Sequence, residues 1–116
     1  MQTDKQAYLL TLIIYKKELI YKKSILTDDL KHCYVCGTTR NIHHHHCIYG
    51  RNWKNADEDG LIVPLCITHH TGYYGVHTKR GKELNKRLKQ ECEKAWLKYY
   101  KKTIKDFIER YRINYL

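Results

Sequence analysis

Two short stretches, CYVCG at residues 33–37 and CITH at residues 66–69, decide how this chain folds. Each stretch carries two metal-binding side chains that are separated by two residues. Zinc binds thiolates and imidazoles as a tetrahedron of four ligands, and a pair with this spacing supplies two of the four corners. A set of unrelated buried cysteines is the alternative interpretation. Because both pairs are present, we predict a structural zinc site held by Cys33, Cys36, Cys66 and His69.

More histidines surround these two stretches. Residues 43–46 are four consecutive histidines, His70 follows the second pair directly, and His77 lies further along the chain. Successive residues of a helix differ by about 100° in direction, so His70 faces away from a zinc ion that its neighbour binds. We interpret His43 and His44 as surface residues. We predict that a second, functional group is formed by His45, His46, His70 and His77.

Hydrophobic periodicity outlines the elements around these residues. Two short strands are predicted at residues 41–48 and 61–65, joined by a polar, turn-rich connection at residues 49–60. Apolar side chains recur at helical spacing over residues 79–101, and this spacing predicts the longest helix. A helix is also predicted at residues 5–23.

Further signals mark helix ends. A helix is expected to begin near Cys66, and the glycines that follow it make its continuation irregular. Thr103 and Asp106 have the spacing of a capping box, which predicts a last short helix through about Tyr111. Trp96 falls on the apolar face of the long helix, so we expect it to be buried.

Together these predictions describe one small α+β domain with a zinc-stapled core and helices on either side of it in sequence. The N-terminal helical and linker segment is expected at residues 1–32, and the core at residues 33–78. Basic C-terminal helices at residues 79–116 are expected to pack on that core.

The composition favours a polyanionic partner. The chain has 22 lysines and arginines against 12 acidic residues, and a formal net charge of +10. Nucleic acid and an anionic membrane surface are the two partners that such a charge favours, and a well-solvated basic surface is the plainer alternative. Five cysteines, an odd number, argue against a closed disulfide framework, and we expect a reducing, cytoplasmic location. The apolar run at residues 7–15 is too short to span a membrane. It lacks a small-residue cleavage site and is followed at once by Lys16, Lys17 and Glu18, so we do not expect a signal peptide.

The stretches CYVCG, IHHHHCIYG, DGLIVPLCITHH and GVH resemble the HNH endonuclease superfamily, which has a ββα-metal core. The resemblance is closest to the phage-type branch that includes the RecA-dependent nucleases. It is detailed over residues 33–78 and loose over residues 79–116. It implies a phage- or prophage-encoded enzyme that hydrolyses DNA phosphodiester bonds in the host cytoplasm.

The resemblance also implies a role for each matching residue. His45 would bind the catalytic metal and His46 would act as the general base. His70 and His77 would complete the catalytic metal site, and the two Cys/His pairs match the family's structural zinc ligands. The implied cofactors are a structural Zn²⁺ and a catalytic Mg²⁺ or Mn²⁺, with Zn²⁺ or Ni²⁺ as other occupants of the catalytic site.

The chain departs from the family pattern where an asparagine usually precedes the second strand. Leu61 stands at that position, and Asp59 and Asn55 are the candidates to replace the asparagine. Adjacent residues of a regular strand also point to opposite faces, so His45 and His46 can serve one site only if the strand bulges or ends there.

Cations near the predicted site are candidate phosphate contacts. Arg51 and Lys54 follow the histidine run, and Tyr73, Tyr74 and Trp53 are candidates to stack on bases. Residues 79–102 contain ten lysines or arginines and three glutamates, so the long helix is expected to track the DNA backbone. The candidate contacts on this segment are Lys79, Arg80, Lys82, Lys86 and Arg87.

A non-catalytic zinc module that binds nucleic acid or protein, for example a phage inhibitor of a host system built on the same scaffold, is the alternative function. It explains the charge and the two Cys/His pairs but leaves the second histidine group without a role. A recombination or packaging protein is a further candidate partner. Both a monomer and a homodimer are compatible with the sequence.

Overall fold

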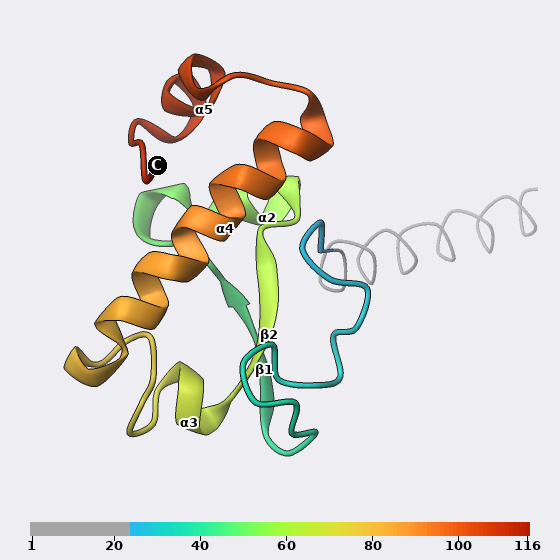
Figure 1. Ribbon diagram of the computed structural model, residues 1–116, viewed down its shortest axis with the longest axis vertical. Helices are drawn as coiled ribbons and strands as arrows, with labels where there is room; N and C mark the ends of the chain where they lie inside the picture. The colour runs from blue at the N-terminus through green and yellow to red at the C-terminus, as the bar shows by residue number, and fades with distance from the viewer. Residues whose placement is uncertain (1–23) are drawn as a thin grey trace, which may run out of the picture.

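The computed structural model describes residues 24–116, which form an α+β fold around a two-stranded antiparallel sheet. Strand β1 spans Ile42–His46 and strand β2 spans Ile62–Cys66, so both predicted strands are confirmed. The helix predicted at residues 5–23 lies outside the described residues. Figure 1 shows the sheet at the centre, with α4 running diagonally in front of it.

Four α-helices follow or connect the strands within the described range. Two short 3₁₀ turns, Gly50–Asn52 and Lys79–Gly81, precede α2 and α4. The predicted long helix and the predicted last helix are both confirmed, and the last begins with the predicted capping box. The α-helices are α2 (Trp53–Asp59), α3 (Ile67–His70), α4 (Lys82–Tyr100) and α5 (Ile104–Tyr111).

The prediction of a turn-rich connection at residues 49–60 is wrong, because α2 occupies most of it. This helix has little apolar periodicity. Only Ala56 and Asp59 of its seven residues are buried, and the second of these is charged. Its burial therefore depends on polar contacts, which a search for apolar spacing does not detect.

Successive histidines of β1 point to opposite faces of the sheet. His43 pairs with Leu65 and His45 pairs with Val63, while His44 lies opposite Pro64 between them. All five residues of β2 are buried, whereas His45 is the only buried residue of β1. β2 is therefore the central strand of the core, and β1 carries its histidines outward from it.

Residues N-terminal to β1 run beside the other edge of β2. The backbone N–H of Ile25 donates to Gly60, and that of Tyr34 donates to the carbonyl of Pro64 at 2.7 Å. The hydroxyl of Ser24 donates to the carbonyl of Ile62 at 2.5 Å. These contacts provide hydrogen-bond partners for backbone groups along the edge of β2 that β1 leaves unpaired.

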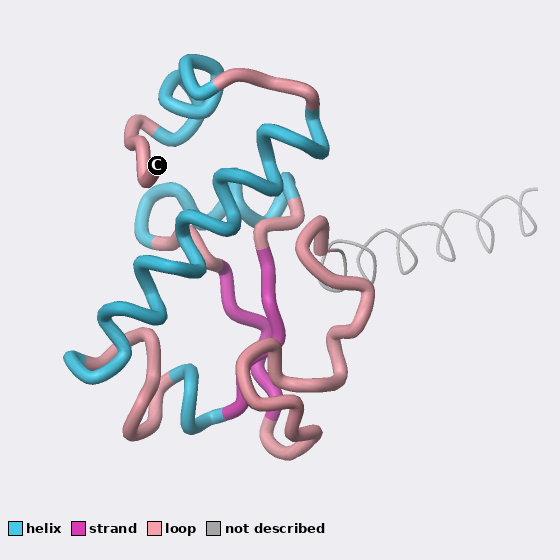
Figure 2. Tube along the Cα trace, in the orientation of Figure 1, coloured by secondary structure: helices cyan, strands magenta, loops and turns pink. Residues whose placement is uncertain are grey.

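The long helix α4 covers the sheet and supplies much of the core. In Figure 2, α4 runs diagonally past the two strands. Leu88, Cys92 and Trp96 from α4 belong to the same buried cluster as Val63 and Leu65 of β2. Burial of Trp96 agrees with its predicted place on the apolar face. Among residues 24–116, none of the helices combines the length and apolar content needed to cross a membrane.

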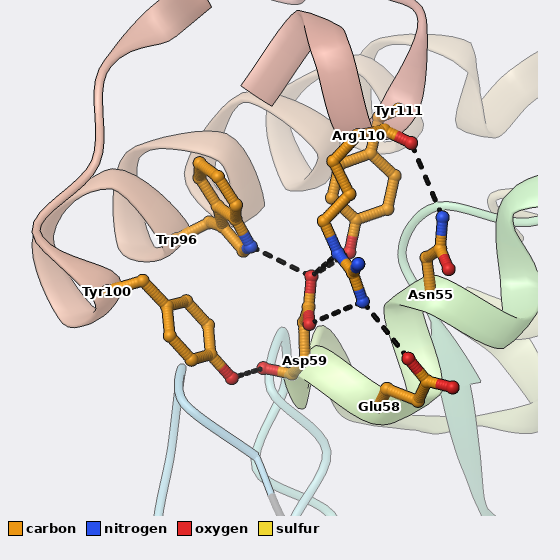
Figure 3. Close-up of polar contacts among 7 residues, drawn as sticks. All are labelled: Asn55, Glu58, Asp59, Trp96, Tyr100, Arg110 and Tyr111. Carbon is orange, nitrogen blue, oxygen red and sulfur yellow. Dashed lines mark hydrogen bonds and ion pairs between the residues drawn. The ribbon is translucent and has the colours of Figure 1, made fainter. Parts of the chain in front are cut away.

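A buried carboxylate ties α2 to the two C-terminal helices (Figure 3). Asp59 accepts hydrogen bonds from the indole N–H of Trp96 at 2.8 Å and from the hydroxyl of Tyr111 at 2.6 Å. The guanidinium of Arg110 donates to both of its oxygens, at 2.6 and 2.9 Å. The backbone carbonyl of Asp59 accepts from the Tyr100 hydroxyl at 2.8 Å. A charge buried in this way is stable because each oxygen has donors.

Candidate functional site

The two Cys/His pairs come together at one end of the sheet. Cys33 and Cys36 lie on the turn before β1, Cys66 is the last residue of β2, and His69 lies on α3. The first turn is closed by hydrogen bonds from Cys33 N–H to Thr38 and from Gly37 N–H to Cys33, both at 2.8 Å. The four ligand atoms all lie within 4.8 Å of one another, so this cluster could hold a metal ion such as zinc.

The spacing of these atoms fits a tetrahedral ion. Two sulfurs that are each about 2.3 Å from a tetrahedral zinc ion lie about 3.8 Å apart. The sulfurs of Cys36 and Cys66 are separated by 3.8 Å. The Nδ1 atom of His69 lies 3.3 Å from the Cys66 sulfur and 3.8 Å from the Cys33 sulfur. The donor set and its geometry therefore fit the ion that the sequence predicts.

The backbone around Cys33 favours a thiolate. Burial raises the pKa of this thiol, but backbone hydrogen bonds from Cys66, Cys36 and Val35 outweigh that effect and lower the pKa to about 6. Burial raises the pKa of Cys66, partly offset by the backbone of His69. A thiolate is the form that binds metal, so the turn prepares Cys33 for an ion.

A second cluster is formed by His45, His70 and His77. Their ligand nitrogens lie within 4.8 Å of one another, and the three rings are mutually edge-on with centroids 4.9 to 5.2 Å apart. His45 comes from β1 and His70 from α3, while His77 comes from the loop after α3. His69 and His70 are adjacent, yet they belong to different clusters, as the rotation of a helix requires.

Close backbone packing returns His77 to this cluster. The N–H of Val76 donates to His69 and the N–H of His77 donates to His70, at 3.0 and 3.3 Å. A Cβ atom on Gly75 would collide with the carbonyl of His70, and one on Gly81 would collide with the carbonyl of Gly75. Only glycine permits these approaches, so the irregular segment after α3 has a fixed path.

Two of the imidazoles are held in the neutral form. Burial, with smaller effects from the charges of His70, His77, His46 and Lys89, lowers the pKa of His45 to about 3. Burial also lowers the pKa of His70, together with His77 and His43. The Nε2 atom of His45 is buried and has no hydrogen-bond partner among the described residues. A neutral imidazole with an unsatisfied buried nitrogen is a ready metal ligand.

Two residues that the sequence analysis did not assign to this cluster contact it. His43 is exposed, as predicted, and its Nδ1 atom lies 2.9 Å from Nδ1 of His70. Tyr49 packs against the rings of His77 and His45, at 5.0 and 5.8 Å between centroids. The alternation of the strand explains His43, which lies on the same face as His45.

His46 makes a different contact on the other face of β1. Its Nε2 atom lies 2.9 Å from a carboxylate oxygen of Asp57, and its ring packs edge-on against Trp53 at 6.0 Å. A carboxylate only accepts hydrogen bonds, so Nε2 carries the proton in this contact. The neutral ring then has its lone pair on Nδ1. The pairing of strand β1 has no bulge, but the strand ends at His46, and that end is the condition under which His45 and His46 could serve one site.

Neither candidate for the missing asparagine contacts a histidine. The Asp59 carboxylate binds the C-terminal helices, and the Asn55 amide donates to the carbonyl of Arg110 at 3.3 Å. Asp57 is the residue that contacts His46, and no pattern in the sequence identified it. Trp53 and Asp57 are four residues apart on α2, so they share the face that meets His46. Recognition of this helix would have revealed the pair.

The predicted DNA contacts are all exposed. Tyr73, Tyr74 and Trp53, the predicted stacking residues, are 59%, 55% and 52% exposed. Five of the exposed cations lie on the segment that starts at Lys79, and two lie beside or on α2. The exposed cations are Arg51, Lys54, Lys79, Arg80, Lys82, Lys86 and Arg87.

Comparison of the chain with protein-family models, with curated proteins and with solved structures found no match in any of the three. The functional assignment of this protein therefore depends on the geometry of the two clusters and on the His46–Asp57 pair.

Proposed function

We propose that this protein is an HNH-type endonuclease that hydrolyses DNA phosphodiester bonds with the help of a divalent metal ion. One observation carries the proposal. A cluster of three imidazoles, those of His45, His70 and His77, lies on one face of β1, and the next residue of that strand is an imidazole oriented by a carboxylate. A metal site and an oriented base are the two parts that such a hydrolase requires.

The Cys/His cluster is assigned a structural role. It has four protein ligands and so leaves no open position for a substrate. It joins the turn before β1 to the start of α3, the helix that carries His70. A zinc ion at Cys33, Cys36, Cys66 and His69 would hold α3 at a fixed distance from β1.

The three-histidine cluster is assigned the catalytic ion. Three protein ligands leave positions for water and for a phosphate oxygen. Imidazole donors suit Zn²⁺, Ni²⁺ and related transition metals better than Mg²⁺, which prefers oxygen ligands. Mn²⁺, Zn²⁺ or Ni²⁺ is therefore the expected occupant rather than Mg²⁺. The ion would neutralise charge that develops on the phosphate and on the leaving oxygen.

His46 is assigned the role of general base. Asp57 holds the Nε2 proton, so Nδ1 is free to accept a proton from the attacking water. The same carboxylate stabilises the imidazolium that forms when the proton is taken. Asp57 is a positioning residue in this scheme, and it replaces the family's asparagine in function although not in sequence position.

DNA is the proposed substrate because of the charge around the site. The exposed cations of α2 and of the segment from Lys79 to Arg87 are available to neutralise phosphates. A phage or prophage origin, a place in the host cytoplasm, and a recombination or packaging protein as a further partner belong to the same proposal. They rest on the resemblance of residues 33–78 to the HNH superfamily.

Plasmid cleavage tests the proposal. Purified protein should cut supercoiled DNA with Mn²⁺, more weakly with Mg²⁺, and His46→Ala should lower the rate by about 100-fold or more while metal content stays unchanged. His44→Ala is the matched control. It removes an imidazole from the same strand, but His44 is exposed and belongs to neither the Cys/His cluster nor the three-histidine cluster.

The alternative function, a non-catalytic zinc module, predicts a different result. It predicts one tightly bound zinc per chain, no exchangeable second ion, and no cleavage of any DNA form with any divalent metal. The three-histidine cluster favours the enzyme because a module does not need a second group of imidazoles.

A further inference from the structure

Two adjacent tyrosines project from the loop between α3 and the turn at Lys79–Gly81. Tyr73 and Tyr74 are 59% and 55% exposed, and their rings meet edge-on with centroids 4.8 Å apart. Exposed aromatic rings cost free energy in water unless a partner covers them. Neither ring belongs to the buried core, so packing within the domain does not explain the pair.

The loop that carries these tyrosines has a fixed backbone. The N–H of Tyr74 donates to Thr68 at 3.1 Å, and the N–H of Gly75 donates to Gly72 at 3.0 Å. The glycine contacts described above hold the segment against α3 and against the start of α4. A rigid backbone presents the two rings at little entropic cost on binding, which is how aromatic side chains become efficient binding surfaces.

The chemistry around the rings is that of a nucleic-acid strand binder. The guanidinium of Arg80 lies 4.0 Å from the centre of the Tyr73 ring, and Tyr73 is still 59% exposed. Lys79 and Lys82 flank Arg80 and are exposed. Aromatic rings beside cations bind strands whose bases are unpaired, because the rings stack on bases and the cations contact phosphates.

The loop also lies next to the proposed catalytic ion. It begins directly after His70 and ends at His77, and both of these belong to the three-histidine cluster. In Figure 1, the loop after α3 lies beside the start of α4 and far from the end of that helix. A base stacked on Tyr73 or Tyr74 would thus belong to a nucleotide close to the phosphate at the metal.

We propose that Tyr73 and Tyr74, with Arg80, form a stacking site for unpaired bases, and that the enzyme binds and cuts single-stranded or locally unpaired DNA in preference to duplex. This inference rests on the proposed nuclease function for its second half. The stacking site itself stands on the exposure, rigidity and charge of the loop.

Equilibrium binding separates stacking from charge. The His46→Ala protein is used because this change prevents cutting, and it is loaded with Mn²⁺ so that the metal site stays filled. It is titrated with three fluorescent ligands: a 12-nucleotide strand, the same sequence as a duplex, and an abasic strand of the same length. We expect the plain strand to bind at least about tenfold more tightly than the abasic strand. Tyr73→Ala and Tyr74→Ala should each weaken plain-strand binding by about five- to tenfold or more and leave abasic binding unchanged.

Tyr99 offers a matched control for both tyrosines. It is 55% exposed, meets Tyr100 edge-on at 4.9 Å, and has lysines beside it, but it lies at the other end of α4. Tyr99→Ala should therefore leave binding of all three ligands unchanged. Tyr73→Phe keeps the ring and loses the hydroxyl, so it should bind the plain strand like the unchanged protein if stacking is the interaction.

Two results would overturn the inference. One is that Tyr73→Ala and Tyr74→Ala bind the plain strand as tightly as the parent protein does. The other is that they weaken abasic, duplex and plain-strand binding equally, which would mark a general charge or folding effect. Failure of the nuclease proposal looks different, since binding would keep its dependence on the tyrosines while no strand is cut by the protein with His46 intact.

Discussion

Two neighbouring histidines of β1 show how surroundings decide the chemistry of a side chain. His45 is buried among other imidazoles, and its pKa is lowered to about 3, so it stays neutral and able to bind metal. His46 is half-buried and contacts a carboxylate. The alternation of the strand sends the first toward α3 and the second toward α2.

The role of Asp57 can be tested by removing its carboxylate. Asp57→Ala should lower kcat about 10- to 100-fold with little change in KM, because the base loses its orientation while the metal cluster and the DNA contacts remain. Asp57→Asn keeps an oxygen that accepts the Nε2 proton, so its loss should be smaller. Single-turnover cleavage of a labelled strand gives both parameters.

Glu58→Ala is the control for this measurement. Glu58 is the next residue of α2, its side chain is 63% exposed, and it contacts Arg110 rather than a histidine. Equal losses in Asp57→Ala and Glu58→Ala would contradict the positioning role. So would a fall in the melting temperature of Asp57→Ala large enough to account for its lower rate.

At the scale of elements, the position of α2 depends on the C-terminal helices. Asp59 ends α2 and accepts hydrogen bonds from α4 and α5. Asn52 and Asn55 add side-chain hydrogen bonds to the carbonyls of Tyr111 and Arg110. The helix that orients His46 is thus supported from the side away from the sheet, and its register depends on residues more than 50 positions later.

Removal of this carboxylate should destabilise the domain. Asp59→Ala leaves the Tyr111 hydroxyl and the Trp96 indole N–H without this acceptor, and it leaves the Arg110 guanidinium with its contact to Glu58. We expect a loss of about 3 kcal/mol in the free energy of unfolding. Glu58→Ala removes an exposed partner of the same arginine, 3.1 Å away, and should cost about 0.5 kcal/mol. Urea unfolding followed by circular dichroism measures both; similar losses would refute the buried role of Asp59.

The elements that the sequence predicted are those with a local signal. Both strands, α4 and α5 are set by apolar spacing or by a capping box, and these signals need no knowledge of distant residues. Helix α2 has no such signal. Its polar side chains find partners only once α4 and α5 are in place, so it was predicted as a connection.

The same reasoning applies to the site. Spacing and helix geometry identified the two Cys/His pairs and the second histidine group. The structure places His45, His70 and His77 of that group together, whereas His46 contacts Asp57. Asp57, Tyr49 and His43 enter through tertiary contacts with residues 11 to 28 positions away. Spacing rules cannot reach such pairs when the intervening element is itself missed.

At the scale of the whole molecule, the Cys/His cluster substitutes for a larger core. The sheet has two strands, and the turn before β1 joins the domain chiefly through Cys33, the hydrogen bond from Tyr34, and the shared cluster. Small domains often need such a metal staple, because they bury too little apolar surface to stabilise every segment.

Loss of the structural ion should therefore unfold this protein. Cys36→Ser changes an exposed ligand, so packing hardly changes, yet we expect it to lower zinc content to below one per chain and to lower the melting temperature by about 10 °C or more. His77→Ala changes an exposed ligand of the three-histidine cluster. It should abolish cleavage but leave the structural zinc bound and the melting temperature nearly unchanged. Thermal melts with elemental analysis give the comparison, and a Cys36→Ser protein that melts like the parent would contradict it.

Helix α3 divides its last two residues between the two clusters, and this constrains how the gene can change. Ile67 and Thr68 are exposed, so many substitutions should be accepted there. Insertion or deletion of a single codon should not be accepted. It would rotate the residues that follow by about 100° about the helix axis, so that neither His69 nor His70 would point into its cluster. Among descendants of this sequence, the segment from Cys66 to His70 should drift in composition while its length stays frozen.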